Sequence, residues 1–572
     1  MKYFFAMAAA AWATVLLSGL HASADESPAD LVLKGGKIVT LDDRNPEVEA
    51  LAARDGRIVA VGRASAIAKL IGDKTKVIDL TGKLAIPGFI EGHGHFTSLG
   101  HTRMELDLRK ARSWDEIVRL VEEAARKTPP GEWIIGHGWH QEKWAARPDP
   151  NIDGYPIHTK LSAVTPKNPV MLSHASGHMC FANAEAMRLA SVTDKTGNPS
   201  GGEILKDAAG NPTGIFRETA QMWVRMARQR ALRNRSADET ARDLDKAIRL
   251  AEEECLAKGI TSFQDAGSDF STIDVFKKMA ENGQLAIRLW VMARTSTNEL
   301  ASKLAQYRMI GVGDNHLTVR GIKQAIDGAL GAHGAWLLEP YEDLPSSSGL
   351  NTTPVNTIRE GARLAIKHNY QLCVHAIGDH ANRETLNVFE EAFQANPGKE
   401  SRRWRIEHAQ HLHPDDIPRF AKLGVVASMQ GIHCTSDAIF ALQRLGVRRA
   451  EQGAYVWQSL MKSGAVVSNG TDTPVEDVDP IPCYYASVTR KLPNGTAFFP
   501  EQKMSRMEAL RSYTVQAAYA AFEEDIKGSL AAGKLADVVV LSEDILTVPD
   551  EKMLDAQVVH TIIGGKVVYS KK

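Results

Sequence analysis

Cysteine is scarce in this sequence, and the net charge is close to zero. Its 572 residues include five cysteines, an odd number without zinc-site spacing, which argues against a disulfide framework or a cysteine-based zinc site. We expect these thiols to be mostly buried. The formal net charge is −1, so no strong field attracts nucleic acid or an anionic membrane, and neither is an expected partner.

Long apolar runs are missing beyond the N-terminus. Residues 3–20 are apolar and follow Lys2, and Ala22-Ser23-Ala24 forms a small-residue cleavage site. An uncleaved membrane anchor is the alternative, because the run is nearly long enough to span a bilayer. The cleavage site and the polar residues after it favour a signal peptide over residues 1–24. We therefore expect export, in a bacterium to the periplasm, and no membrane association after cleavage.

The composition of the rest is that of a globular chain with a large core. Hydrophobic residues make up 44% and charged residues 24% of the sequence, and the length implies two or three compact units. Short β-rich segments separated by glycine turns fill residues 25–83, and residues 528–572 show the same pattern. We therefore expect one small β-sandwich domain that is built from both termini.

The middle of the chain, residues 84–527, alternates apolar strands with amphipathic helices, as in parallel α/β folds. The strand candidates are residues 84–91, 259–264, 287–292, 317–326, 371–375, 403–408, 424–429 and 465–470. Helical patterns include residues 113–127, 237–258, 271–282, 357–368 and 381–395. Eight alternating units predict a (β/α)₈ TIM barrel.

A large insertion at about residues 100–258 separates the first two strand candidates. It contains further strand-like runs, so a different strand count stays open. We expect the insertion to lie over the barrel mouth, because the loops at the carboxyl ends of barrel strands carry function.

Metal-binding residue types recur where the candidate strands end. His93 and His95 are two residues apart, so on a strand both imidazoles point to one side. The later members of the set are Lys323 in the fourth strand, His375 and His408 at the ends of the fifth and sixth, and Asp472 after the eighth. Each has a structural explanation when taken singly. Their recurrence at one place in a barrel predicts a metal centre, since active sites lie at the carboxyl ends of the strands.

Several motifs resemble the amidohydrolase superfamily, and more narrowly amidohydrolase family 3, the branch with N-substituted formamide deformylases and proteins described as exoenzyme regulators. The resemblance covers nearly all of the expected mature chain. Its motifs include Pro87-Gly88-Phe89-Ile90-Glu91-Gly92-His93-Gly94-His95, Gly136-His137-Gly138-Trp139, His375-Ala376-Ile377-Gly378-Asp379, Glu407-His408-Ala409-Gln410 and Gly533-Lys534-Leu535-Ala536-Asp537.

The resemblance implies a metal-dependent hydrolase with two divalent ions. By position, His93 and His95 would bind the more buried ion, and His375 and His408 the more exposed one. Lys323 would match the lysine that many relatives carry as a carbamate bridging both ions, and Asp472 the aspartate that handles the proton. Zinc is the expected metal, although histidine and carboxylate ligands also suit iron, manganese and cobalt. A single ion is the alternative if Lys323 is unmodified.

Elementary chemistry supports these roles. A lysine buried in a barrel strand has a lowered pKa, and its neutral amine can take up CO₂. Two ions about 3.5–4 Å apart can polarise a carbonyl and activate water as hydroxide. Asp472 could then take the proton and pass it to the leaving amine as general acid.

Substrate recognition is less well marked in the sequence. The candidates are Trp139, His178, His333 and His433. The insertion is rich in imidazole and indole, which indicates either a lid that lines the pocket or the packing of a large loop. Two departures from common family forms stand out: Glu91-Gly92 replaces the usual Asp-Ser, and a run around His333 replaces one that carries arginine.

Together these features predict an exported metal-dependent amidohydrolase. It would use a metal-activated hydroxide to hydrolyse a non-peptide C–N bond of amide, N-acyl or N-formyl type, and its expected partner is a small-molecule substrate. The alternatives are an ester or lactone hydrolase on the same site and a non-catalytic exported regulatory protein. The sequence leaves the oligomeric state open, a homo-oligomer included.

Overall fold

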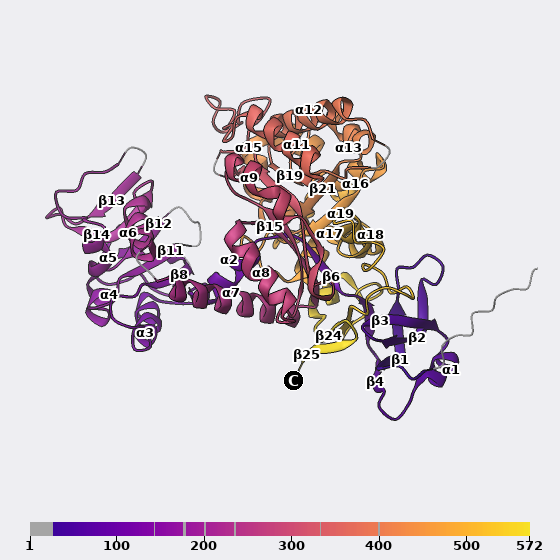
Figure 1. Ribbon diagram of the computed structural model, residues 1–572. Coiled ribbons are helices and arrows are strands. Elements are labelled where there is room, and N and C mark those ends of the chain that lie inside the picture. The colour runs from indigo at the N-terminus through magenta and orange to yellow at the C-terminus, as the bar shows by residue number, and fades with distance from the viewer. Residues whose placement is uncertain are drawn as a thin grey trace, which may run out of the picture.

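The computed structural model describes residues 27–141, 144–174, 179–199, 202–233, 236–331, 333–398 and 401–571. The signal peptide expected at residues 1–24 lies outside these described residues. Within them, no helix combines the length and the apolar character needed to cross a membrane. Figure 1 shows a central barrel with the inserted unit on one side and the N-terminal strands on the other.

The centre of the molecule is a ring of parallel strands. Within the described residues, eight strands follow the order β22-β21-β20-β19-β18-β16-β15-β6, with every neighbouring pair parallel. The two end strands meet where Asp472 N donates to His93 O and His95 N donates to Thr473 O, both at 2.8 Å. The strands are β6 (Phe89–Gly94), β15 (Ile260–Ser268), β16 (Arg288–Ala293), β18 (Leu317–Ala325), β19 (Gln371–Ala376), β20 (Arg405–His408), β21 (Val426–Gln430) and β22 (Val467–Gly470).

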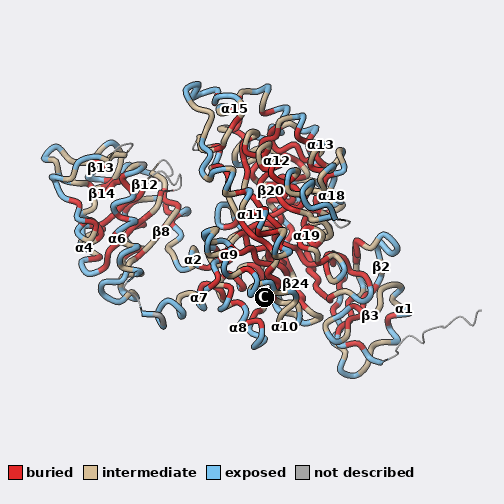
Figure 2. The backbone as a smooth tube through the Cα atoms, turned by 45° about the horizontal axis from the view of Figure 1, so that its top comes forward, coloured by how far each residue is buried: buried red, intermediate tan, exposed pale blue. Residues whose placement is uncertain are grey.

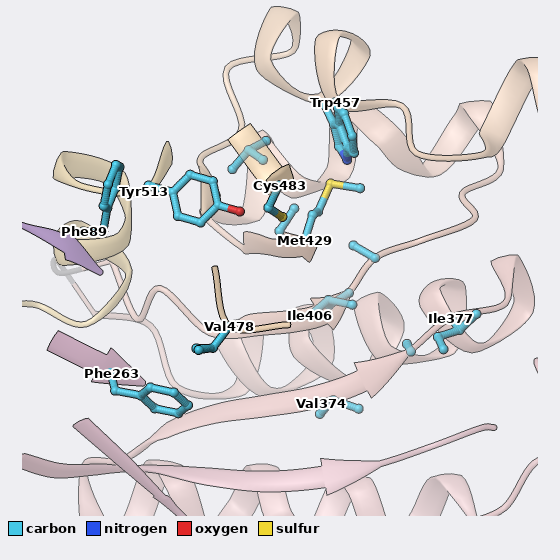
Figure 3. Close-up of a cluster of buried hydrophobic side chains, with 14 of the residues drawn as sticks. Phe89, Phe263, Val374, Ile377, Ile406, Met429, Trp457, Val478, Cys483 and Tyr513 are labelled. Atoms are coloured by element: carbon cyan, nitrogen blue, oxygen red, sulfur yellow. The ribbon is translucent and has the colours of Figure 1, made fainter. Parts of the chain in front are cut away.

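Amphipathic helices surround this ring, as the sequence pattern predicts. They include α8 (Phe270–Glu281), α9 (Thr297–Tyr307), α11 (Val355–His368), α12 (Asp379–Ala395), α13 (Ile417–Leu423), α15 (Ala438–Gly453), α16 (Trp457–Lys462), α17 (Pro480–Thr489), α18 (Arg506–Ser512) and α19 (Val515–Ala520). The side chains of Asp269 and Ser296 start α8 and α9 by accepting a hydrogen bond from the backbone of the third residue. Apolar side chains such as Phe263, Ile406 and Trp457 fill the space between elements (Figure 3).

A second, mixed sheet joins the two ends of the chain. In it β23 lies between β24 and β5, so C-terminal strands complete a sheet begun by N-terminal ones. Its strands are β1 (Leu31–Val39), β2 (Glu47–Arg54), β3 (Arg57–Gly62), β4 (Lys76–Asp79), β5 (Leu84–Pro87), β23 (Val538–Leu541), β24 (Val558–Ile563) and β25 (Lys566–Ser570). The predicted fold class, a TIM barrel with a small β domain built from both termini, is confirmed.

A buried ion pair fastens the small domain to the barrel. Arg288, at the start of β16, donates from Nε to Asp537 Oδ2 at 2.7 Å and from Nη2 to Oδ1 at 3.0 Å. Asp537 directly precedes β23, and Gly564 N donates to its Oδ1 at 2.8 Å. Within the Gly533–Asp537 motif, the aspartate therefore has a structural role at the domain junction.

The strand expected over residues 84–91 is two strands. β5 pairs with β1 and β23 in the small domain, whereas β6 pairs with β15 in the barrel. The break falls at Gly88, where an ideal Cβ would lie 2.2 Å from Thr261 Oγ1, so a side chain there has no room. The first barrel strand therefore begins at Phe89, later than the sequence pattern indicates.

The insertion forms a unit of its own. Its sheet has the order β13-β14-β12-β11-β8-β7 and packs on its own apolar cores. The elements are β7 (Leu106–Asp107), α3 (Trp114–Ala125), β8 (Ile134–Trp139), α4 (Thr159–Val164), β11 (Val170–His174), β12 (Met179–Ala182), α5 (Ala184–Leu189), β13 (Gly202–Lys206), β14 (Pro212–Glu218) and α6 (Gln221–Arg233).

Two helices, α2 (Phe96–Arg103) and α7 (Ala237–Ala257), connect this unit to the barrel and pack against each other. Figures 1 and 2 show the unit beside the barrel, with its own buried interior. The expectation that it lies over the barrel mouth is wrong for this structure. The physical reason is that its apolar side chains face its own sheet.

Candidate metal centre

The six predicted ligand residues converge at the carboxyl ends of the barrel strands. The ligand atoms of His93, His95 and Asp472 all lie within 4.8 Å of one another. The Nε2 atom of His95 is 3.3 Å from Asp472 Oδ1, and that of His93 is 3.5 Å from the same oxygen. Lys323 reaches into the group from β18, with Nζ 3.4 Å from His93 Nε2.

The other two histidines extend this group across the barrel. The ring centroids of His375 and His408 are 4.5 Å apart, and those of His93 and His408 are 4.8 Å apart. Gln430, at the end of β21, holds the His408 ring, with Oε1 2.8 Å from Nδ1. The strand-end pattern thus brings side chains from five different strands to one place.

Burial sets the protonation states that metal ligands need. It lowers the pKa of His375 to about 3, helped by the Lys323 charge, and lowers the pKa of His408 well below its ordinary value. Burial also lowers the pKa of Lys323. For Asp472, burial would raise the pKa, but interactions with the His93 and His95 imidazoles bring it well below the ordinary value. The site therefore offers neutral imidazoles at His375 and His408 and an ionised carboxylate at Asp472.

The donor set fits divalent ions. Among the described residues, the buried atom Asp472 Oδ1 has no hydrogen bond within ordinary geometry, and the Nε2 atoms of His95 and His93 lie 3.3 and 3.5 Å from it. A buried polar atom without a hydrogen bond is costly, and coordination of an ion would satisfy it. The Nε2 atom of His375 instead lies 3.5 Å from the buried carboxylate of Asp327. Imidazole nitrogen and carboxylate oxygen are the ligands that zinc and related ions take in catalytic sites.

A buried carboxylate beneath the centre was not predicted from the sequence. Glu407 Oε2 bonds His93 Nδ1, which leaves Nε2 of the same ring facing the centre. Arg405 donates from Nε to Glu407 Oε1 at 2.7 Å and also to Gly92 O at 2.7 Å. Burial would raise the pKa of Glu407, but the charge of Arg405 and the hydrogen bond with His93 hold it well below the ordinary value. The missed signal is a pair of opposite charges two residues apart in an otherwise apolar strand.

Glu91 and Gly92, which stand where relatives usually have Asp-Ser, support the loop that carries Asp472. Thr471 donates to Glu91 from its backbone N at 2.7 Å and from its hydroxyl at 3.1 Å. Burial raises the pKa of Glu91 to about 8. At Gly92 an ideal Cβ would lie 2.3 Å from Asn469 O, so the close approach of β6 and β22 requires glycine.

A cavity of about 740 Å³ opens beside this centre. Its walls include His95, Lys323, His375, His408 and Asp472 from the centre, and Arg294, Ala329, Leu330, Ile377, Gln410, His433, Asp437, Phe440, Arg444 and Val475 around it. The volume suits a small organic molecule. His433 follows β21 and lines this cavity, and its role in substrate binding stays a prediction.

The other substrate candidates lie elsewhere. Trp139 is 1% exposed in the core of the insertion, where its Nε1 donates to Leu172 O at 2.9 Å. His333 binds Asp343 at 3.1 Å, outside the cavity wall. Trp139 therefore does not line this cavity, because its ring packs inside the insertion. His333 is not among the residues that line the cavity, and its role in substrate binding stays a prediction. His178 lies outside the described residues.

Known proteins are similar to this chain in sequence and in fold. The amidohydrolase family profile matches residues 76–569. Protein LONG AFTER FAR-RED 3 of Arabidopsis thaliana is 34% identical over 95% of this chain and 92% of its own length. N-substituted formamide deformylase of Arthrobacter pascens is 25% identical over 95% of this chain and 98% of its own length.

Among solved structures, an uncharacterized metal-dependent hydrolase from Pyrococcus horikoshii OT3 is similar at a TM-score of 0.74 and 26% identity, covering 91% of this chain and 99% of that one. The chain belongs to the amidohydrolase family. It is a metal-dependent hydrolase, in a class that acts on carbon–nitrogen bonds other than peptide bonds.

Proposed function

We propose that this protein is an exported amidohydrolase with two divalent ions, which hydrolyses the C–N bond of a small N-acyl or N-formyl amide. The observation that carries the proposal is the convergence of His93, His95, Lys323, His375, His408 and Asp472 at one cavity. The 25% identity to a protein named N-substituted formamide deformylase supports an amide substrate.

In the proposed site, some side chains bind the ions and another moves a proton. His93 and His95 would hold the more buried ion, and His375 and His408 the more exposed one. Zinc is the proposed metal, since neutral imidazoles and a carboxylate suit its preferences. When bound, the ions polarise the substrate carbonyl and make water a better nucleophile near neutral pH.

Lys323 is the proposed bridge between the two ions. Its amine is buried and its pKa is lowered, so the neutral form that reacts with CO₂ is accessible. Nζ would bond the carbon of CO₂ and lose a proton, and the carbamate would carry one negative charge shared by its two oxygens. Without this modification the site would hold one ion.

Asp472 is the proposed proton carrier. Asp472 lines the cavity, and its Oδ1 lies 3.3 Å from His95 Nε2 and 3.5 Å from His93 Nε2. The carboxylate would accept a proton at Oδ1 as the water oxygen bonds the carbonyl carbon. It would then give that proton to the amide nitrogen as the C–N bond breaks, so a carboxylic acid and a free amine leave. His433 lines the same cavity and is the proposed substrate contact after β21.

Metal analysis and turnover together test this function. Protein purified without added metal should contain close to two equivalents of divalent ion, and it should hydrolyse members of a panel of N-formyl and N-acetyl amines. Lys323→Ala should lose metal and activity, whereas His413→Gln, a change at a histidine on the surface, should leave both unchanged. Full activity at a metal content near zero would contradict the proposal.

The panel also separates the alternatives. Turnover of esters or lactones without turnover of amides would favour an ester or lactone hydrolase on the same site. A metal-loaded protein that turns over neither class would favour the non-catalytic regulatory role.

Export rests on residues 1–24 alone. N-terminal sequencing of protein from fractionated bacterial cells should find a mature chain that starts near Asp25 in the periplasmic fraction. A full-length chain that stays with the membrane would contradict cleavage.

A further inference from the structure

The polar side chains of the cavity that do not belong to the metal centre are Arg294, Gln410, His433, Asp437 and Arg444. Three of them are committed to protein partners. Gln410 Nε2 donates to Tyr455 OH at 2.7 Å and to Asp437 Oδ2 at 3.1 Å, and Tyr455 OH donates to the same oxygen at 2.8 Å. Arg444 is tied to Asp343 and donates to Gly331 O at 2.9 Å.

Arg294 is different, because its guanidinium is uncommitted. No carboxylate or carbonyl oxygen in the described part of the chain accepts a hydrogen bond from it. Only its backbone is anchored, with N donating to Ser268 O at 2.9 Å. An arginine in a cavity wall with five free donors is a ready partner for a planar anion.

The methylene groups of Arg294 pack against the backbone of β15. At Gly267 an ideal Cβ would lie 2.6 Å from Arg294 Cδ, so the absence of a side chain at Gly267 makes room for the arginine methylenes. Arg294 lines the same cavity as Lys323 and His375, beside the metal centre. The backbone of β15 thus positions the charge.

The barrel order places Arg294 opposite His433. Arg294 follows β16, the third strand, and His433 follows β21, the seventh, so four strand positions separate them in a ring of eight described strands. His433 Nε2 is buried and has no hydrogen-bond partner among the described residues. A molecule across the cavity would meet His433 on one side, the metal centre beneath, and Arg294 at the exposed rim.

We propose that Arg294 binds a carboxylate of the substrate, so that the preferred substrates are N-acylated amino acids rather than neutral N-acyl amines. The inference rests on the proposed function and names its substrate class. Neither aspartate of the cavity competes with a substrate carboxylate for Arg294. Asp472 lies beside His93 and His95, and Asp437 accepts two hydrogen bonds on the far wall.

Matched pairs of substrates test the inference. Each pair is an N-formyl or N-acetyl amino acid and its decarboxylated analogue, an N-acyl amine with the same side chain. The metal-loaded wild type should favour the acid. In Arg294→Gln, kcat/KM for the acid should fall by about 10- to 100-fold, chiefly through KM, because a charge-assisted hydrogen bond is lost. The value for the neutral analogue should change less than about twofold.

Two further variants control for charge and for geometry. Arg294→Lys should recover part of the loss, because lysine keeps the charge but cannot bind a carboxylate through two parallel bonds. Arg363→Gln removes a positive charge from the surface of α11, where it pairs with Glu360, and should have no effect. Arg294 is exposed, so its replacement should leave the melting temperature unchanged.

The outcomes distinguish the two proposals. Turnover of neutral analogues with no preference for acids, or an Arg294→Gln enzyme that treats acids as the wild type does, would overturn the carboxylate assignment and leave the amidohydrolase function standing. A wild type that hydrolyses neither member of any pair would overturn the proposed function, and this inference with it.

Discussion

The charge of Glu407 should set the affinity of the centre for metal. Glu407→Gln keeps the shape of the side chain but removes the carboxylate that binds His93 Nδ1. Removing such a partner of a metal-binding histidine typically weakens metal binding by about 10- to 100-fold. That range corresponds to about 1.4–2.7 kcal/mol in binding free energy.

The same substitution should destabilise the protein without metal. Glu407 and Arg405 are both 0% exposed, and the guanidinium bonds both carboxylate oxygens. Removing one member of a buried pair costs about 3–5 kcal/mol, because the other charge stays buried. The remaining bonds from Arg405 to Gly92 O and Ser428 Oγ, each 2.7 Å, favour the lower end of this range.

Two measurements separate these effects. Competition with a chelator of known affinity gives the metal dissociation constant of the folded protein, and denaturant unfolding of the metal-free protein gives its stability. Glu252→Gln is the matched control, since Glu252 is also buried but bonds Ala286 N far from the centre. A folded Glu407→Gln protein whose metal affinity stays within twofold of the wild type would refute the reasoning.

Three further predictions concern stability and the two substrate candidates that do not line the cavity. Asp537→Asn should lower the free energy of unfolding by about 3–5 kcal/mol in urea titrations, since Arg288 stays buried without its countercharge. Burial would raise the pKa of Asp537, but Arg288 holds that pKa below its ordinary value of about 3.9. The stabilisation should thus be present above about pH 4 and be lost as the pH falls toward the lowered pKa, and in Asp537→Asn this part of the acid dependence should be absent. Trp139→Phe should leave kcat/KM unchanged and cost about 1 kcal/mol of stability through the lost bond to Leu172 O, as differential scanning calorimetry can show. His333→Ala should change kcat/KM by less than about fivefold in steady-state assays, because it reaches the cavity wall only through a partly exposed ion pair.

The place of the candidate ligands in the fold could be predicted from the sequence because barrel geometry is repetitive. Parallel strands put their carboxyl ends at one face, so a polar residue that ends an apolar strand has a known place. That rule holds for His375 and His408, which end runs of buried residues. It also holds for Lys323, whose charge within an apolar strand marks the barrel interior.

The insertion shows where local patterns stop being informative. Trp139 lies in a stretch typical of the family, yet its ring packs against Trp144 and His174 inside the insertion. The pattern of apolar, polar and turn residues predicts the strands and helices of such a unit. Its place relative to the barrel depends on α2 and α7 and on which apolar face finds a partner, which are tertiary properties.

The sequence alone determined the alternation of strands and helices, the two β-rich ends and the residues that close each barrel strand. These features follow from side-chain period and polarity over short stretches of chain. Only the tertiary structure decided that Glu407 lies under His93, that Gly267 makes room for Arg294, and that Gly88 divides the first strand between two sheets. Each of these depends on contacts between residues far apart in the chain, which no local pattern specifies.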